Sequence, residues 1–181
     1  SGFAAAGLKG IDMWAARRII ALGRVFPPLF FAFVLGGEDP IDHVQRQALR
    51  SGRELHPLLE RIMRIHATEE ARHLSFARSY LKAAVQEMGP IRRGVLGVGG
   101  PLILSQMAKL MMQPSRQVVR RHQIPRSVIR AAYRRNPAHR AESMASLRKV
   151  RRLWADLGLL GPVYRRFWAI LGLREVTVTS S

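Results

Sequence analysis

RIHATEEARHLSF, residues Arg64–Phe76, gathers His66, Glu69, Glu70 and His73 on what the sequence predicts to be one long helix. The whole chain of 181 residues has only 12 acidic residues and six histidines, so this is a marked concentration. Successive helical residues turn by about 100°, which puts all four side chains on one face about 100° wide. One helix therefore offers two imidazoles and two carboxylates to one point in space, a donor set that suits iron, manganese or zinc.

Spacing alone leaves two interpretations of this cluster open. Glu and His at i,i+3 and i,i+4 on a surface helix would stabilise it by only about 0.2–0.5 kcal/mol per pair. Alternatively, the neighbouring Ile62, Ile65 and Leu74 partly bury the cluster, and a metal would offset the cost of burying its charge. Glu-x-x-His is the helical half-site of di-iron carboxylate bundles, which favours Glu70 with His73 as the metal-binding pair.

The rest of the sequence predicts an all-α fold, with no alternating strand pattern or hairpin turn. The longest periodic segment runs from Glu54 to about Met88. A separate helix is predicted to begin at Asp39 as N-cap, with Pro40 in its first turn, and to end at Ser51-Gly52. The apolar helix that follows residue 90 is predicted to kink at its Gly-Gly-Pro sequence, residues 99–101. Shorter helices should follow up to about residue 173.

Composition limits the classes of protein to consider. The chain has no cysteine, which excludes a disulfide scaffold and a thiolate metal site and fits a cytoplasmic location. The formal charge is +18, and the 30 basic residues include only four lysines. Because the arginines are scattered in pairs and only 7% of residues are aromatic, solvated helix faces explain the charge better than a nucleic-acid groove. The longest apolar run, Val25–Gly37, is shorter than the ~20 residues of a membrane span.

RIHATEEARHLSFAR resembles the signature of the p-aminobenzoate N-oxygenase family, the AurF-type di-iron oxygenases. His66, Glu70 and His73 match the family's His-x-x-x-Glu-x-x-His arrangement, in which the first histidine is an additional iron ligand. The upstream GEDPIDHVQRQALR is similar to the family's helix that carries another glutamate ligand. The downstream NPAHR and LGLLGPVYRRFWAILGL resemble its C-terminal end. The resemblance covers nearly all of this chain, but only the second half of the family's domain.

The resemblance implies a ferritin-like di-iron helical bundle, present as its second half with additional C-terminal helices. The implied cofactors are two iron ions, with manganese as the alternative metal, and the implied ligands are Glu38, His66, Glu70 and His73. Glu69 would orient a ligand imidazole or an arginine. No catalytic residue is implied beyond the metal ligands.

The upstream ligand departs from the family pattern, because Pro40 should break or kink the helix that carries it. The spacing to His66 is also one residue longer than in the family. Asp39 is therefore the alternative to Glu38.

The implied activity is an O2-dependent N-oxygenation or hydroxylation of an aryl amine or a similar small aromatic or apolar substrate. Such an enzyme needs an external electron donor, and a homodimer is expected, with no specific nucleic acid as partner. The resemblance does not identify the substrate-binding residues. Ile62, Ala77 and the Phe30–Val34 segment are candidates to line the pocket.

A complete di-iron centre of this kind needs a second Glu-x-x-His and a further glutamate, and the sequence has a single Glu-x-x-His. We therefore expect residues 1–175 to be the C-terminal portion of one domain, incomplete alone, followed by a tail at 176–181. Two alternatives stay open. One is a half-size ferritin-like protein that completes its metal site by homodimerisation. The other is a non-catalytic basic helical protein that binds nucleic acid or a membrane surface.

Overall fold

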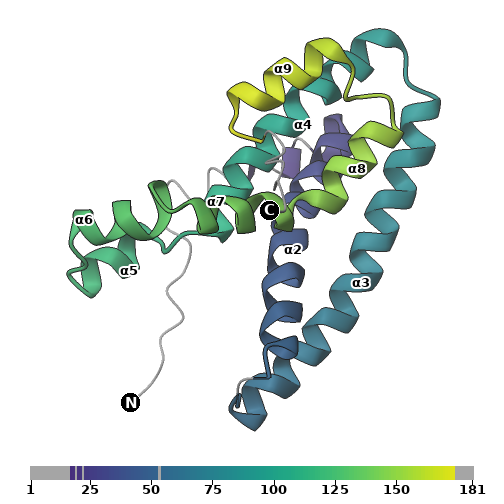
Figure 1. Cartoon of the computed structure of the whole chain (residues 1–181). Coiled ribbons are helices and arrows are strands. Elements are labelled where there is room, and N and C mark those ends of the chain that lie inside the picture. The colour runs from purple at the N-terminus through teal and green to yellow at the C-terminus, as the bar shows by residue number, and fades with distance from the viewer. Residues whose placement is uncertain (1–16, 19, 22, 53, 174–181) are drawn as a thin grey trace, which may run out of the picture.

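The computed structural model describes residues 17–18, 20–21, 23–52 and 54–173, and every regular element within them is a helix. This confirms the predicted all-α class. Three long helices form the body: α2 (Pro27–Arg50), α3 (Pro57–Gln86) and α4 (Pro90–Met111). Each has proline in its first turn, where the missing N–H costs no hydrogen bond. Figure 1 shows α2 and α3 running side by side from the turn that joins them, and α2 also packs along α4.

Six shorter elements follow the three long helices. They are α5 (Arg116–Arg121), α6 (Arg126–Ile129), the π-helical turn η1 (Arg130–Arg134), α7 (Pro137–Ser146), α8 (Arg148–Asp156) and α9 (Pro162–Ile170). Both α7 and α8 contact α2, and α9 contacts α4. Figure 1 shows α5 and α6 projecting from this body as a separate arm. The tail predicted at 176–181 lies outside the described residues.

One prediction about α2 was wrong. The helix is continuous from Pro27 to Arg50, so no new helix starts at Asp39. Pro40 lies inside it and is fully buried. A proline inside a helix costs about 3 kcal/mol, and tertiary packing has to offset that cost. Gly36 allows close packing here, because a Cβ on it would lie 3.1 Å from Cβ of Met107 in α4.

The apolar helix predicted after residue 90 is α4, which runs as one helix through Gly99-Gly100-Pro101, where the sequence predicts a kink. The glycines of this helix allow large side chains to approach its backbone. A Cβ on Gly97 would lie 2.6 Å from the ring of Tyr164, and a Cβ on Gly100 would lie 2.6 Å from the ring of Trp154. These two glycines therefore serve packing against the C-terminal helices.

The core lies between α2, α3, α4 and the C-terminal helices. Its largest fully buried apolar side chains are Trp154, Trp168, Leu35, Leu74, Leu81, Leu96 and Leu104. One helical stretch in the described chain, Pro90–Arg121, is long and apolar enough to cross a membrane by length and composition, with 44% of its apolar window buried. Core helices of soluble proteins satisfy the same criterion, and α4 packs its small and apolar residues on α2 as a core helix does.

Candidate metal centre

Two neighbouring helices bring the predicted ligands together. Glu38 projects from α2, and His66, Glu70 and His73 project from α3. Oε1 of Glu38 lies 3.7 Å from Nδ1 of His73, and Oε1 of Glu70 lies 3.8 Å from Nδ1 of His66. The continuity of α2 through Pro40 keeps Glu38 on the helix that packs against α3. The cluster therefore consists of two carboxylate–imidazole pairs at the α2–α3 interface.

The carboxylates and the imidazoles have different environments. Glu70 and Glu38 have side chains that are 12% and 28% exposed, whereas His66 and His73 are 59% and 62% exposed. The cluster thus lies at the edge of the α2–α3 interface, with its imidazoles on an open face of α3. The same face exposes the apolar side chains of Leu58, Leu59, Ile62, Ile65 and Phe76.

Burial changes the acidity of both carboxylates. It raises the pKa of Glu70, and the charges of Asp42 and Glu38 raise it further, while His66 lowers it. Burial also raises the pKa of Glu38, and His73 lowers it, while Asp39 raises it. Because Glu38 contributes to the shift at Glu70, the two carboxylates belong to one electrostatic cluster. A nearby cation would stabilise both in their charged forms.

Each carboxylate also has an oxygen without a partner. Oε2 of Glu38 and Oε2 of Glu70 are buried and accept no hydrogen bond within the described part of the chain. Buried carboxylate oxygens are normally hydrogen-bonded, paired or bound to metal. Two unsatisfied carboxylates beside two imidazoles fit iron or manganese. In the described chain, however, no three His, Asp or Glu side chains already converge closely enough to hold an ion. The cluster therefore consists of two separate pairs, Glu38 with His73 and Glu70 with His66.

Asp39, the alternative upstream ligand, has a different role. Its side chain is 1% exposed and accepts a hydrogen bond from Nη2 of Arg78 on α3. Asp42, one turn further along α2, accepts hydrogen bonds from Arg46 at 2.6 Å and from Lys149 at 3.2 Å. Both aspartates are thus held in ion pairs between helices. Only Glu38 of the two candidate ligands lies beside His73.

Sequence reasoning missed these ion pairs and one further contact. The Asp42–Arg46 pair could have been found from its i,i+4 spacing on a helix. The bond between His43 Nε2 and Glu142 Oε1, at 2.5 Å, joins residues 99 positions apart, and no local pattern indicates it. Glu69 contacts an arginine, one of its two expected partners: its side chain is 57% exposed, and its Oε1 lies 3.8 Å from Nη1 of Arg72.

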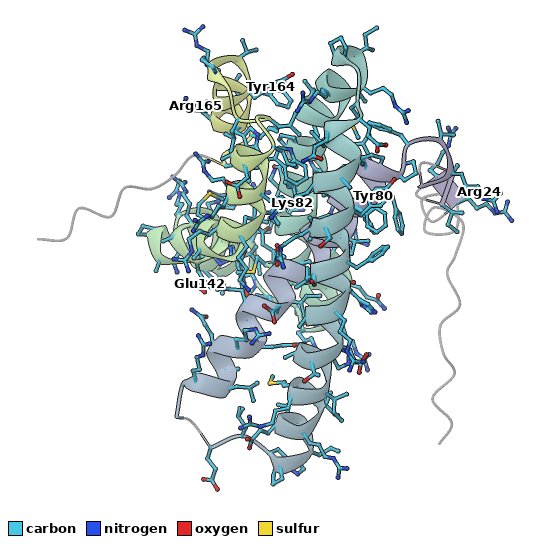
Figure 2. All side chains as sticks on the ribbon, turned by 90° about the vertical axis from the view of Figure 1, so that its right-hand side faces the viewer. Arg24, Tyr80, Lys82, Glu142, Tyr164 and Arg165 are labelled. Atoms are coloured by element: carbon cyan, nitrogen blue, oxygen red, sulfur yellow. The ribbon has the colours of Figure 1, made fainter. Side chains whose placement is uncertain are left out.

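A hollow of about 400 Å³ opens beside the cluster. Its lining residues are Phe31, Val34, Glu38, Arg72, His73 and Phe76. The hollow therefore contacts one carboxylate–imidazole pair directly and is otherwise mostly apolar. Rings of Phe31 and Phe76 meet edge to face with centroids 5.6 Å apart, and Tyr80 (Figure 2) tilts against Phe31 at 4.4 Å.

Two of the pocket residues expected from sequence lie elsewhere. Ala77 is fully buried in the core, and Ile62 is exposed rather than part of the hollow. The Phe30–Val34 segment does contribute, through Phe31 and Val34.

Helices that carry Glu-x-x-His and a further glutamate on a neighbouring helix define the helical carboxylate-bridged metal proteins. Within that class, this chain belongs to the p-aminobenzoate N-oxygenase AurF family, a family of di-iron enzymes whose model matches residues 2–158. The match confirms the family resemblance seen in the sequence. No solved structure shows a significant match to the chain.

Curated relatives of the chain come from mycobacteria. The uncharacterized protein Rv0885 of Mycobacterium tuberculosis and the uncharacterized protein Mb0909 of Mycobacterium bovis are each 33% identical to it over 164 residues. The aligned region covers 91% of this chain and 48% of each relative. The chain thus spans about half the length of the relatives that it matches.

Proposed function

We propose that this chain supplies one half of a di-iron centre in an oxygenase that uses O2 to oxidise an aryl amine or a similar small substrate. The observation that carries the proposal is the pair of buried, unpartnered carboxylate oxygens on Glu38 and Glu70, beside His66 and His73. Nothing else in the described chain satisfies those oxygens, and a divalent cation would do so. Family membership supports the same chemistry.

The four residues would act as ligands from two rigid helices. Glu70 and His73 form the Glu-x-x-His half-site, Glu38 reaches it from α2, and His66 adds an imidazole from the preceding turn of α3. Iron bound there would supply the activation of O2, with electrons from an external donor. In the charged form, both carboxylates would stabilise the metal, and the histidines would bind it as neutral imidazoles.

The hollow next to Glu38 and His73 is the proposed substrate site. Its aromatic and aliphatic walls, Phe31, Val34 and Phe76, would hold an apolar ring and exclude water from the reacting atom. Aromatic contacts between α2 and α3 fix these walls in place. The substrate would then be held against the ligand pair by apolar packing.

The second half-site needs another Glu-x-x-His, in addition to the one that Glu70 and His73 form. The relatives are about twice as long, which favours a further segment of a longer polypeptide. A second copy of this chain is the alternative source, and a C2 dimer would present two copies of Glu70 and His73. Either source would cover the exposed apolar face of α3.

We further propose that the enzyme acts in the cytoplasm and receives electrons from an external donor.

Metal analysis of the purified protein tests the proposal. In the complete protein, with the second half-site present, iron should bind in stoichiometric amounts, and Glu70→Ala or His73→Ala should abolish that stoichiometry. Glu69→Ala is the matched control, because its carboxylate is one residue away on the same helix but is exposed and lies near Arg72. It should retain most of the iron. O2 uptake with an aryl amine and a chemical reductant should follow the iron content.

Two results would count against the proposal. Equal loss of iron in Glu69→Ala and Glu70→Ala would mean that the half-site is assigned wrongly. An iron-free protein that binds no iron on reconstitution, either alone or with the second half of its domain, would favour a helical scaffold without the chemistry.

A further inference from the structure

The arm of the molecule formed by α5, α6 and η1 encloses a second hollow, of about 710 Å³. It is remote in sequence from the metal cluster and shares no lining residue with the hollow beside it. Its lining is Gln113, Pro114, Arg116, Val119, Arg120, Arg126, Ile129, Arg130 and Arg134. Five of these nine residues are arginines, and none is acidic.

The sequence builds this hollow from two arginine ladders. Arg116 and Arg120 stand one turn apart on α5, and the other three recur at spacings of four along α6 and η1. Ser115 caps α5 by accepting a hydrogen bond from the N–H of Val118. A turn then reverses the chain, with Gln123 at a positive φ of 49°. Both ladders thereby line the same hollow.

The charge of the ladders is not balanced nearby. The sequence has no aspartate or glutamate between Glu87 and Glu142. No ion pair or side-chain hydrogen bond joins any of the five guanidinium groups to another described residue. Three arginines on α2 and α3, by contrast, each form an ion pair with a carboxylate: Arg46, Arg64 and Arg78. Like charges at this helical spacing repel, so an anion in the hollow would stabilise the arm.

The lining also indicates the chemistry of the anion. Guanidinium groups are planar forks that bind phosphate oxygens through two parallel hydrogen bonds. The volume lies within the roughly 300–1,000 Å³ of small-molecule sites. No aromatic side chain lines the hollow, so it offers nothing on which a nucleic-acid base could stack. The π-helical turn that forms one wall is a rare conformation that frequently occurs at functional sites.

We propose that the arginine hollow binds an anion with two or more linked or adjacent phosphate groups. Five guanidinium groups exceed what a single phosphate can neutralise, whereas a di- or triphosphate offers several acceptor oxygens over the same span. Two sources share this chemistry: a free polyphosphate compound and the headgroup of a multiply phosphorylated lipid. The site does not depend on iron or on the oxidation chemistry.

Calorimetric titration of the 181-residue chain tests the site, at a fixed ionic strength of about 0.15 M so that screening is constant. The probes are tripolyphosphate, pyrophosphate and orthophosphate. Affinity should fall in that order. The double variant Arg120→Gln/Arg130→Gln should weaken tripolyphosphate binding at least about tenfold, because each removed arginine takes away charge-assisted hydrogen bonds.

The matched control removes the same charge elsewhere. Arg93 and Arg166 are exposed and line neither hollow, so Arg93→Gln/Arg166→Gln should change the affinity less than about threefold through the general field alone. Far-ultraviolet circular dichroism checks that both double variants keep their helical content. Binding to lipid is measured with vesicles of phosphatidylcholine that contain a bisphosphorylated inositol lipid. Phosphatidylglycerol vesicles are the comparison.

Each outcome decides the matter. Selective loss in Arg120→Gln/Arg130→Gln with tripolyphosphate supports a soluble ligand, and the same loss seen only with bisphosphorylated vesicles supports a lipid headgroup. Equal loss in the two double variants would show that net charge alone attracts anions, which overturns the proposal. So would the absence of binding to every phosphate probe and to both kinds of vesicle.

Discussion

Oε1 of Glu38 on α2 lies 3.7 Å from Nδ1 of His73 on α3, and this contact joins the two helices where one oxygen of Glu38 and one of Glu70, Oε2 in each, are buried without a hydrogen-bond partner. The pair depends on a helix that continues through a buried proline. Had a new helix begun at Asp39, as the sequence predicted, Glu38 would precede it in a loop. The site therefore rests on tertiary packing that local sequence rules do not indicate.

The buried carboxylates of Glu38 and Glu70 should make the metal-free protein less stable than variants with a neutral side chain at either position. Glu38→Gln and Glu70→Gln should each raise the unfolding midpoint of the metal-free protein at pH 7, because the neutral amide removes the cost of burying a charge. The same substitutions should abolish iron binding. Thermal unfolding followed by circular dichroism, with a chelator present, measures the first effect.

The sign of the pH dependence follows from the raised pKa of each carboxyl group. A carboxyl whose pKa is higher in the folded state favours folding when it is protonated. The parent protein thus gains stability as pH falls through the raised folded pKa, and the gain is complete below the unfolded value of about 4.5. The advantage of the Gln variants should vanish there. Glu69→Gln, at an exposed position, should change the midpoint little at any pH. A midpoint lowered at pH 7 by Glu70→Gln would contradict this account.

His66 should affect oxidation more than it affects metal content. It lies one turn before Glu70, with its Nδ1 3.8 Å from that carboxylate, and its side chain is 59% exposed. His66→Ala removes one donor of four, so some iron should remain, with metal affinity lowered at least about tenfold. Oxidation of an aryl amine should be lost. A variant that oxidises the amine at the parent's rate would show that His66 has only a structural role.

The buried ion pair between Asp39 and Arg78 should stabilise the protein much more than an exposed one. Removing Arg78 leaves a carboxylate that is 1% exposed without its cation, and Arg78→Ala should cost about 3–5 kcal/mol of unfolding free energy. Arg64→Ala is the control, because the Arg64–Glu60 pair on α3 is 65% and 41% exposed and should contribute only about 0.3–0.5 kcal/mol. Urea unfolding measures both. Similar losses of unfolding free energy in the two variants would show that burial does not strengthen the Asp39–Arg78 pair.

Much of the candidate site could be predicted from the sequence, because one helix carries most of it. His66, Glu70 and His73 share a face of α3 by periodicity alone, and Pro57 and His56 mark the start of that helix. The position of Glu38 was predicted only through the family resemblance. Its geometry could not be derived locally, since proline at position 40 favours a helix start by every local rule.

The arginine hollow shows a different limit. The four-residue spacing of Arg126, Arg130 and Arg134 was visible in the sequence, but it is equally typical of a solvated helix face. What distinguishes a binding hollow is a second ladder across from the first, and that arrangement depends on the turn between α5 and α6. Long-range pairs such as His43 with Glu142 are beyond sequence patterns for the same reason.

Close packing of α4 against the C-terminal helices gives the last prediction. A methyl group on Gly100 would lie 2.6 Å from Cζ2 of Trp154, whose side chain is fully buried. Gly100→Ala should therefore destabilise the protein by about 1–3 kcal/mol through overpacking. Gly94→Ala is the matched control on the same helix, because nothing lies within 4 Å of its added methyl group. It should stabilise the protein by up to about 1 kcal/mol through helix propensity. Urea unfolding should thus give changes of opposite sign, and a stabilising Gly100→Ala would mean that Trp154 does not pack on α4 in solution.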